Sequence, residues 1–234
     1  MFIELPDGKC MLVDAGESSF GEKLENHIRN AGYSYIDYVV ATHPHADHIG
    51  GMAHILSNFE VGTFYMPDKT HTTKTFEKMM DALRENGCER KLVFSGDVIA
   101  EGIYDITVLS PLKYEYQRMN NYSVVLKISY GDVSMLLSAD AEVSAETDML
   151  EAGLDLDSDI LKVGHHGSST STTQKYLDAI SPDDAIISVG EDNSHGVPST
   201  LVIAYLQSRG INIHSTYEKG DINVSTDGYI YVVD

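Results

Sequence analysis

The sequence has few of the features that direct a protein into a membrane or out of the cell. Its longest apolar runs, such as 38–41 and 185–187, are far shorter than the about 20 residues that a membrane-spanning helix needs. Residues 1–6 contain no basic region followed by an apolar stretch, so they predict no secretory signal. The sequence therefore favours a cytoplasmic protein, with no membrane segment in this chain.

Cysteine is equally scarce, with Cys10 and Cys88 the only two in the chain. Neither residue lies in a Cys-x-x-Cys pair or beside a histidine cluster, which argues against a metal site with cysteine ligands. Disulfides are uncommon in a large domain that has no export signal. We therefore interpret both cysteines as reduced structural thiols.

Basic residues are outnumbered, because 16 Lys and Arg stand against 36 Asp and Glu, for a net charge of −20. Such a surface repels polyanions at long range, so the charge disfavours a broad nucleic-acid-binding face. Two bound divalent metals could still make the inside of a cleft locally cationic. The charge therefore leaves room for a small or short anionic substrate.

No repeat, low-complexity tract or flexible linker divides the chain, and we expect a single metallo-hydrolase domain over residues 1–234. Short β-type runs alternate with amphipathic helical stretches, which favours an α/β domain with two sheets packed face to face and helices outside. The expected strands cover 2–5, 10–14, 35–41, 61–66, 91–94, 104–109, 123–130, 133–138, 160–163, 185–189, 211–216, 222–224 and 229–232, and the expected helices cover 20–31, 49–56, 73–85 and 201–208.

The segment 42–51, Thr-His-Pro-His-Ala-Asp-His-Ile-Gly-Gly, carries the strongest chemical signal in the chain. Residues two apart on a strand point to the same side, so His43 and His45 can converge on one metal as the strand ends. Asp47 and His48 follow in the next turn, where they can face a second metal. The sequence therefore predicts a metal centre at this point.

Two later segments repeat the pattern of an apolar strand that ends in metal-ligand residues. Asp140 follows 133–138; alone it could be a strand-end or helix-capping residue, but beside a two-metal cluster it is better interpreted as a bridging carboxylate. The strand 160–163 leads into His165 and His166. One of these should ligate metal and the other should contact substrate or support the site. We expect His165 to be the ligand, because its side chain should point to the same side as those of the alternate residues in the preceding strand. We expect the His166 side chain to turn toward the cleft.

Taken in this order, the motifs resemble those of the metallo-β-lactamase superfamily. The early segment 13–16 looks like the Asp motif that supports the metal loop, which is the segment 42–51 here. The segment 43–48 matches the superfamily signature. The stretches 120–126 and 162–168, with Asp140 between them, resemble the branch typified by the metallo-β-lactamase-like domain of the competence DNA-uptake protein ComEC. The resemblance covers nearly the whole chain and implies a four-layer αββα sandwich.

The resemblance also implies a ligand set for two divalent metal ions, of which zinc is expected first and manganese is the alternative for a site without sulfur. Both ions would polarise a shared water toward hydroxide, which gives Asp47 and Asp140 a part in catalysis. The first ion would be held by His43, His45 and Asp140, and the second by Asp47, His48, His165 and Asp140.

The chain departs from the branch at several positions. The first site lacks the third histidine of other branches, so Asn120, Asn121 or water would complete it. The branch has a motif near its C-terminal end that contains a histidine. In this chain Val197 occupies that position, and the histidine lies two residues earlier, at His195. His195 could complete a coordination sphere or act as a general acid, or it could be a solvated loop residue. The chain also begins just after the place of an additional strand, so it is either naturally short or a fragment.

The expected activity is metal-dependent hydrolysis of a phosphodiester, with a small-molecule phosphoester or a short nucleic-acid end as substrate. DNA is a possible substrate through the ComEC resemblance. The alternatives are hydrolysis of amide, lactam or thioester bonds on the same centre, and a non-catalytic domain that binds metal or a partner. The residues expected to contact substrate are His166, Ser168, Asn120, Asn121 and Asn193.

Overall fold

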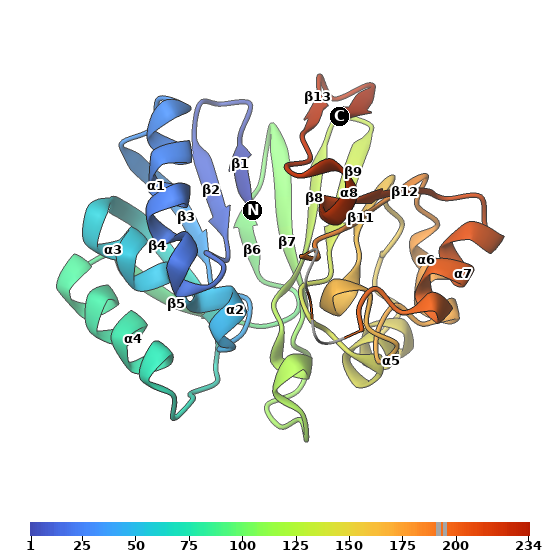
Figure 1. The fold of residues 1–234 in the computed structure, drawn as a ribbon, viewed down its shortest axis with the longest axis horizontal. Coiled ribbons are helices and arrows are strands. Elements are labelled where there is room, and N and C mark those ends of the chain that lie inside the picture. The colour runs from blue at the N-terminus through green and yellow to red at the C-terminus, as the bar shows by residue number, and fades with distance from the viewer. Residues whose placement is uncertain (191–192, 194–195) are drawn as a thin grey trace. The chain divides into compact units, whose positions relative to one another are not determined.

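A computed structural model of the chain describes residues 1–190, 193 and 196–234. The chain forms two compact units, Met1–Val93 and Phe94–Asp234. Each unit has its own β-sheet, and helices cover one face of that sheet (Figure 1). The single domain expected over residues 1–234 stays a prediction.

The first unit contains a five-stranded sheet in the order β1-β2-β3-β4-β5. The first pair of strands is an antiparallel hairpin, and the remaining neighbours run parallel. Its strands are β1 (Phe2–Glu4), β2 (Cys10–Val13), β3 (Tyr35–Val40), β4 (Glu60–Pro67) and β5 (Glu89–Val93); its helices are η1 (Ser18–Phe20), α1 (Gly21–Asn30), α2 (Ala46–Ile49), α3 (Met52–Asn58) and α4 (Lys74–Asn86).

The helices of the first unit form where capping and apolar spacing agree. At α4, the Thr73 side chain accepts a hydrogen bond from the backbone N–H of Phe76, and Gly87 ends the helix with a φ of 76°. Side chains that recur every three or four residues along α4, such as Phe76, Met79 and Leu83, are buried in the core beneath the sheet. Because β2 and β3 are parallel, the residues that follow them meet at one edge of the sheet.

The second unit contains a seven-stranded sheet in the order β12-β11-β10-β9-β8-β7-β6 and a separate two-stranded sheet, β13-β14. Strands β6 to β9 pair antiparallel, and β9 to β12 pair parallel. The strands are β6 (Val98–Ala100), β7 (Tyr104–Ser110), β8 (Val125–Tyr130), β9 (Val133–Leu137), β10 (Ile160–Lys162), β11 (Asp184–Ile187), β12 (Asn212–Ser215), β13 (Val224–Thr226) and β14 (Tyr231–Val233); the helices are η2 (Met119–Tyr122), α5 (Val143–Glu151), η3 (Gly164–Gly167), α6 (Gln174–Ile180), α7 (Thr200–Ser208) and α8 (Thr216–Lys219).

The parallel pairing of β9 with β10 decides where the polar residues of this unit lie. Leu136 on β9 and Leu161 on β10 are opposite each other and are fully buried in the core that α5, α6 and α7 cover. Their strands end at the same edge of the sheet, so Asp140 and the loop that contains η3 emerge side by side. The longest helix in the described part of the chain, α4, has 13 residues, and no described helix could span a membrane.

The structure contains elements that the sequence did not predict. The short helix α6 begins at Thr173, whose side chain accepts from the backbone N–H of Tyr176, and it was missed because only seven residues follow this cap. The last hairpin was expected over 222–224 and 229–232, but its strands are 224–226 and 231–233. The connecting loop keeps four residues but lies two positions later, at 227–230, where Asp227 accepts from two backbone N–H groups, those of Tyr229 and Ile230.

A cluster of polar side chains connects this last hairpin to the seven-stranded sheet. Asp184, on β11, accepts from His214 Nε2 at 2.6 Å and from the Tyr231 hydroxyl at 2.7 Å. Burial alone would raise the pKa of Asp184, but these two hydrogen bonds outweigh it and lower the pKa. The ionised carboxylate therefore stabilises the fold, and its contribution is lost as the pH falls through the lowered pKa.

We expect Tyr231→Phe to reduce the free energy of unfolding by about 1.5–3 kcal/mol at pH 7, because it removes a hydrogen bond to a charged acceptor. Urea unfolding of both proteins measures the difference, which should narrow as the pH falls below about 4, where the unfolded carboxyl also titrates. Tyr229→Phe is the control, since that side chain is 78% exposed. Equal stability of the Tyr231→Phe protein and the unsubstituted protein at pH 7 would contradict the assignment.

Candidate metal centre

The first unit presents four potential metal ligands in the loop and short helix that follow β3. His43 is 1% exposed and His48 is 7% exposed, so both rings are held inside the structure. His43 Nε2 lies 3.1 Å from His45 Nδ1. Two nitrogens that bind the same zinc ion at about 2.0–2.1 Å in tetrahedral geometry stand about 3.3 Å apart. The spacing of these two rings therefore fits a shared metal ion.

His48 is oriented by the partly buried carboxylate of Asp14. Its Nδ1 lies 2.7 Å from Asp14 Oδ2, and Asp14 also accepts from Thr42 through the backbone N–H at 2.8 Å and the hydroxyl at 2.7 Å. With Nδ1 engaged, Nε2 is the nitrogen that can ligate metal, and it stands 3.6 Å from Asp47 Oδ2. Metal-binding histidines are commonly held through their second nitrogen by such a carboxylate. The geometry of this unit therefore fits a metal site, with Asp14 as its support.

The charge of Asp14 follows from its surroundings. Burial alone would raise its pKa, but the His48 and His43 rings and the hydrogen bond from Thr42 N lower it below the ordinary value. The carboxylate is therefore ionised at neutral pH, as an acceptor of three hydrogen bonds should be. The sequence resemblance had given Asp14 a supporting part, and these contacts agree with it.

Two consecutive glycines keep the metal loop close to the loop after β2. A Cβ on Gly50 would lie 2.5 Å from Ser18 N, and one on Gly51 would lie 2.5 Å from Ala15 O. The backbone of His48 is fixed by the same approach, since Ala15 N donates to His48 O at 2.8 Å. Glycine is required at both positions because a side chain would push the two loops apart.

Asp14→Asn is expected to weaken metal binding by about 10–100-fold, because an amide can donate to His48 Nδ1 and so favour the tautomer that blocks Nε2. Competition with a chromogenic zinc chelator measures the affinity of the purified protein. Asp37→Asn is the matched control: that carboxylate accepts from a backbone N–H in the same sheet, that of Cys10. Unchanged zinc affinity in the Asp14→Asn protein would contradict the supporting role.

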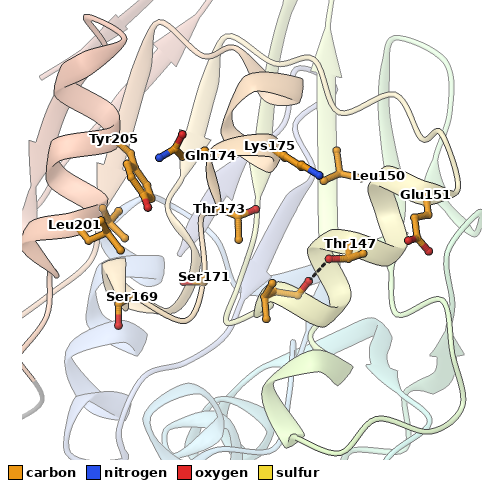
Figure 2. Close-up of a pocket in the computed structure, with 12 residues that line it drawn as sticks. Thr147, Leu150, Glu151, Ser169, Ser171, Thr173, Gln174, Lys175, Leu201 and Tyr205 are labelled. Atoms are coloured by element: carbon orange, nitrogen blue, oxygen red, sulfur yellow. Dashed lines mark hydrogen bonds between the residues drawn. The ribbon is translucent and has the colours of Figure 1, made fainter.

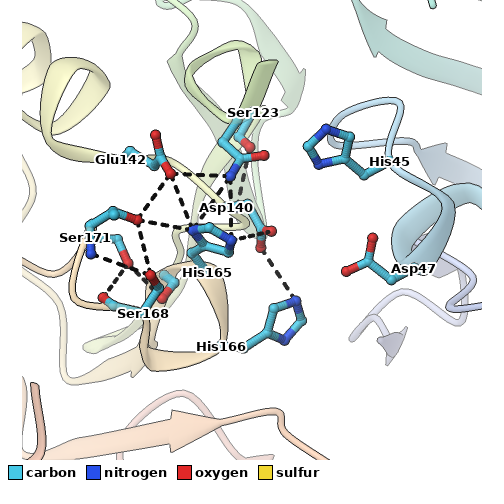
Figure 3. A network of polar contacts seen from close by, with 12 residues as sticks. His45, Asp47, Ser123, Asp140, Glu142, His165, His166, Ser168 and Ser171 are labelled. Carbon is cyan, nitrogen blue, oxygen red and sulfur yellow. Dashed lines mark hydrogen bonds and ion pairs between the residues drawn. The ribbon is translucent and has the colours of Figure 1, made fainter. Parts of the chain in front are cut away.

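The second unit places a buried carboxylate beside two histidines. Asp140 is 2% exposed, and its backbone N–H donates to Ser123 Oγ at 3.2 Å. One carboxylate oxygen lies 3.8 Å from His165 Nε2 and the other lies 3.7 Å from His166 Nε2. Figure 3 shows the two rings on different sides of this carboxylate. The structure of this unit therefore brings together the three residues that the sequence singled out there.

The two histidines differ in what their second nitrogen does. His166 Nδ1 is 2.7 Å from the carbonyl oxygen of Ser188, which can only accept, so Nδ1 carries the proton and Nε2 has the lone pair. His165 Nδ1 lies instead 3.4 Å from Glu142 Oε1 and 3.2 Å from Thr170 Oγ1. Both kinds of partner, a backbone carbonyl and a carboxylate, can support a metal ligand, but the 2.7 Å contact holds the His166 ring more tightly than the longer contacts hold His165.

The argument from sequence for His165 assumed that strand geometry continues beyond β10. In the structure His165 and His166 both adopt left-handed backbone conformations, with φ values of 47° and 56°. The alternation of side chains along the strand therefore ends before these two residues. It cannot predict the direction in which either side chain points. The choice of His165 as the ligand stays a prediction, without the support of that alternation.

Among the expected substrate contacts, the two asparagines lie in the short helix η2. Asn121 Oδ1 accepts from the backbone N–H groups of Glu142 and Ala145, which places it at the start of α5. Asn120 Nδ2 donates to Glu142 Oε1 at 3.3 Å. Both amides are buried, at 8% exposure for Asn120 and 2% for Asn121. Their contacts organise the surroundings of Glu142, and contact with a substrate stays a prediction for each.

The remaining expected site residues lie in loops. Ser168 Oγ lies 3.0 Å from Thr170 Oγ1. Asn193 donates to Val197 O and accepts from Val197 N, so its side chain closes the loop in which it lies. His195 lies outside the described residues, and its part in the site stays a prediction.

Glu142 was not singled out from the sequence, although it lies at the centre of the polar network in the second unit. Its side chain is 3% exposed and accepts from Arg118, Asn120 and Thr170. The sequence offered one signal, which was the position of Glu142 two residues after Asp140. A buried carboxylate with several donors cannot be recognised without knowing which loops approach it.

A cavity of about 500 Å³ in the second unit lies apart from these residues (Figure 2). It is formed by α5, α6, α7 and the loop before α6, with Leu150, Thr173, Leu201 and Tyr205 among its lining. None of the expected metal ligands lines it. The expected metal ligands of this unit therefore lie at the strand ends and not in this cavity.

An imidazole pair and a carboxylate-held histidine in one unit, and a buried Asp beside two histidines in the other, are the candidate metal ligands of an α/β protein. Residues 1–191 match the sequence profile of the Metallo-beta-lactamase superfamily, and the chain belongs to that superfamily. The metallo-β-lactamase fold expected from the sequence is confirmed. Each unit supplies one of its sheets together with the helices that cover it.

The resemblance to the competence branch is confirmed by curated relatives. The chain is 33% identical over 205 residues to ComE operon protein 3 of Bacillus subtilis, an alignment that covers 87% of this chain and 26% of the relative. It therefore spans about a quarter of the length of that relative. It is also 28% identical over 220 residues to Ribonuclease Z of Aeropyrum pernix, covering 89% of this chain and 66% of the other.

Among solved structures, the fold is similar to that of the metallo-beta-lactamase fold protein YhfI from Bacillus subtilis. The TM-score is 0.57 at 12% identity, and the match covers 90% of this chain and 85% of the other. At this identity the likeness shows the fold alone.

Proposed function

We propose that the chain is a metal-dependent hydrolase whose two units each contribute ligands to a centre of two divalent ions. The observation that carries the proposal is the pair of Asp14 with His48, because a carboxylate on Nδ1 prepares the ring to ligate through Nε2. The ligands from the first unit would be His43, His45, Asp47 and His48, and those from the second would be Asp140 with His166 or His165.

Between the two neighbouring histidines of the second unit, we favour His166 as the ligand. Its Nδ1 is committed to a backbone carbonyl, whereas His165 is surrounded by Glu142 and Thr170. His165 would then hold the Asp140 carboxylate in place from within the network. This assignment reverses the expectation drawn from the sequence, and a pair of substitutions can decide between them.

The chemistry of the donors agrees with zinc, and manganese is the alternative because imidazole and carboxylate suit both ions. When bound, such ions supply a Lewis acid and lower the pKa of water to about 7. The protein's own part is to fix the ligands, as Asp14 does for His48, and to keep the Asp140 carboxyl buried beside the histidines. A catalytic part for Asp47, Asp140 and His195 belongs to this proposal.

The substrate we propose is a phosphodiester, in a small molecule or at the end of a short nucleic acid. Ribonuclease Z is by its name an RNA-cleaving enzyme, which supports a phosphodiester for a chain that resembles it. The net charge of −20 opposes a long polyanion spread over the surface. A cytoplasmic location is part of the same proposal.

A hydrolysis panel tests the proposal against its alternatives. The purified protein, loaded with zinc or manganese, is given bis(p-nitrophenyl) phosphate and a chromogenic cephalosporin. We expect turnover of the phosphodiester that stops when a chelator removes the metal. Turnover of the cephalosporin alone would favour amide or lactam hydrolysis. Stable metal binding without turnover of either compound, or of a thioester, would favour a non-catalytic binding domain.

A further inference from the structure

Arg118 is an exposed cation attached to the polar network of the second unit. It lies immediately before η2, and its side chain is 64% exposed. Its Nη1 donates to Glu142 Oε2 at 2.9 Å, and the side chain of Glu142 is 3% exposed. A buried carboxylate therefore holds a guanidinium whose larger part faces solvent.

The geometry leaves most of the guanidinium available. An arginine side chain has five N–H donors, and among the described residues the Arg118 side chain donates only to Glu142. The other oxygen of Glu142 is already occupied, since it accepts from Thr170 at 2.9 Å and from Asn120 at 3.3 Å. The carboxylate is thus fixed by its own donors, and it holds Arg118 in turn.

The same carboxylate connects Arg118 to the ligand residues of this unit. Glu142 Oε1 is 3.4 Å from His165 Nδ1, and His165 Nε2 is 3.8 Å from Asp140 Oδ2. The guanidinium is therefore separated from the proposed ligand Asp140 by one carboxylate and one imidazole. The chain has 16 basic residues and 36 acidic ones, so most charges on its surface are negative. The fixed positive charge of Arg118 differs from them in sign.

We propose that Arg118 binds a phosphate oxygen of the substrate and so determines specificity for anionic esters, with Glu142 as its positioning residue. A guanidinium presents parallel N–H donors that match two phosphate oxygens, and a fixed arginine loses little freedom on binding. This inference rests on the proposed phosphodiester hydrolysis, but it makes a separate statement about anion binding in the second unit.

The structural alternative is that Arg118 only covers the buried charge of Glu142. That role predicts lower stability after substitution and no selective effect on anions. Recognition of substrate predicts in addition a weaker affinity for anions and a raised KM, because uniform binding of a substrate group changes KM and leaves kcat nearly constant. The two roles are therefore separated by measuring stability, metal content and anion affinity on the same variants.

The experiment compares Arg118→Gln, Arg118→Lys and the control Arg84→Gln, which removes an equal charge from an exposed ion pair on α4. Calorimetry measures the affinity of the zinc-loaded proteins for inorganic phosphate, and kinetics measure KM for bis(p-nitrophenyl) phosphate. We expect Arg118→Gln to weaken phosphate binding and to raise KM by about 10-fold, with zinc content unchanged and the melting temperature lowered only by the lost hydrogen bond to Glu142. Arg118→Lys should lie in between, and Arg84→Gln should match the unsubstituted protein.

Phosphate binding is measured whether or not the protein hydrolyses the ester, so failure of the proposed reaction and failure of this inference are distinguishable. Equal phosphate affinity in the Arg118→Gln and unsubstituted proteins would overturn the inference. It would also be overturned if the unsubstituted zinc-loaded protein bound no phosphate, or if Arg84→Gln weakened binding as much as Arg118→Gln.

Discussion

Asp140→Asn is expected to remove most of the bound metal and to abolish turnover of a phosphodiester. The carboxylate is buried, stands beside both histidines of its unit, and is the proposed bridging ligand. An amide keeps the shape of the side chain but loses its charge and one acceptor oxygen. The loss of affinity should exceed the about 10–100-fold that accompanies loss of a supporting residue, because a ligand itself is altered.

Metal content after desalting and the initial rate with bis(p-nitrophenyl) phosphate measure this effect. Asp132→Asn is the matched control, because this substitution removes the same charge. Asp132 is exposed and lies in the turn at the other end of β9. An Asp140→Asn protein that retains the full complement of metal would show that Asp140 is a strand-end residue without a part in the centre.

His166→Ala is expected to lower the metal content by about one ion per chain, whereas His165→Ala keeps the ions and loses turnover. The reason is that His166 is prepared for ligation by the hydrogen bond of Nδ1 to Ser188 O, while His165 contacts Glu142 and Thr170. The two substitutions remove the same group from adjacent residues, so each is the control for the other.

Elemental analysis of both proteins after zinc loading makes the comparison, and circular dichroism checks that each is folded. Metal lost from His165→Ala and kept by His166→Ala would restore the assignment made from the sequence. Metal kept by both proteins would remove the pair from the ligand set.

The sequence predicts the fold well because its signals are local and ordered. The segment 42–51 joins a strand to histidines and an aspartate at ligand spacing, and the resemblance of the other motifs follows the same order along the chain. Parallel pairing of β9 with β10 then explains why Asp140 and the histidines of η3 emerge at one edge. The motifs themselves are local in the sequence, whereas the pairing that brings their strand ends together is seen in the structure.

The sequence is less informative where a backbone turns or where distant loops meet. The left-handed conformations of His165 and His166 remove the alternation on which their assignment depended. Glu142 acquires its importance from donors that lie 22 to 28 residues away in the chain, such as Asn120 and Thr170. Asp227 accepts two backbone hydrogen bonds that place the last turn at 227–230, two residues later than the sequence predicts.

The metal content of the purified chain tests the central claim most directly. The protein is loaded with zinc or manganese, freed of unbound metal, and analysed by inductively coupled plasma mass spectrometry together with His48→Ala and Asp140→Asn. The account predicts about two ions per chain in the unsubstituted protein and a loss in each variant, since each unit contributes ligands. An unsubstituted protein that retains no zinc and no manganese would contradict it.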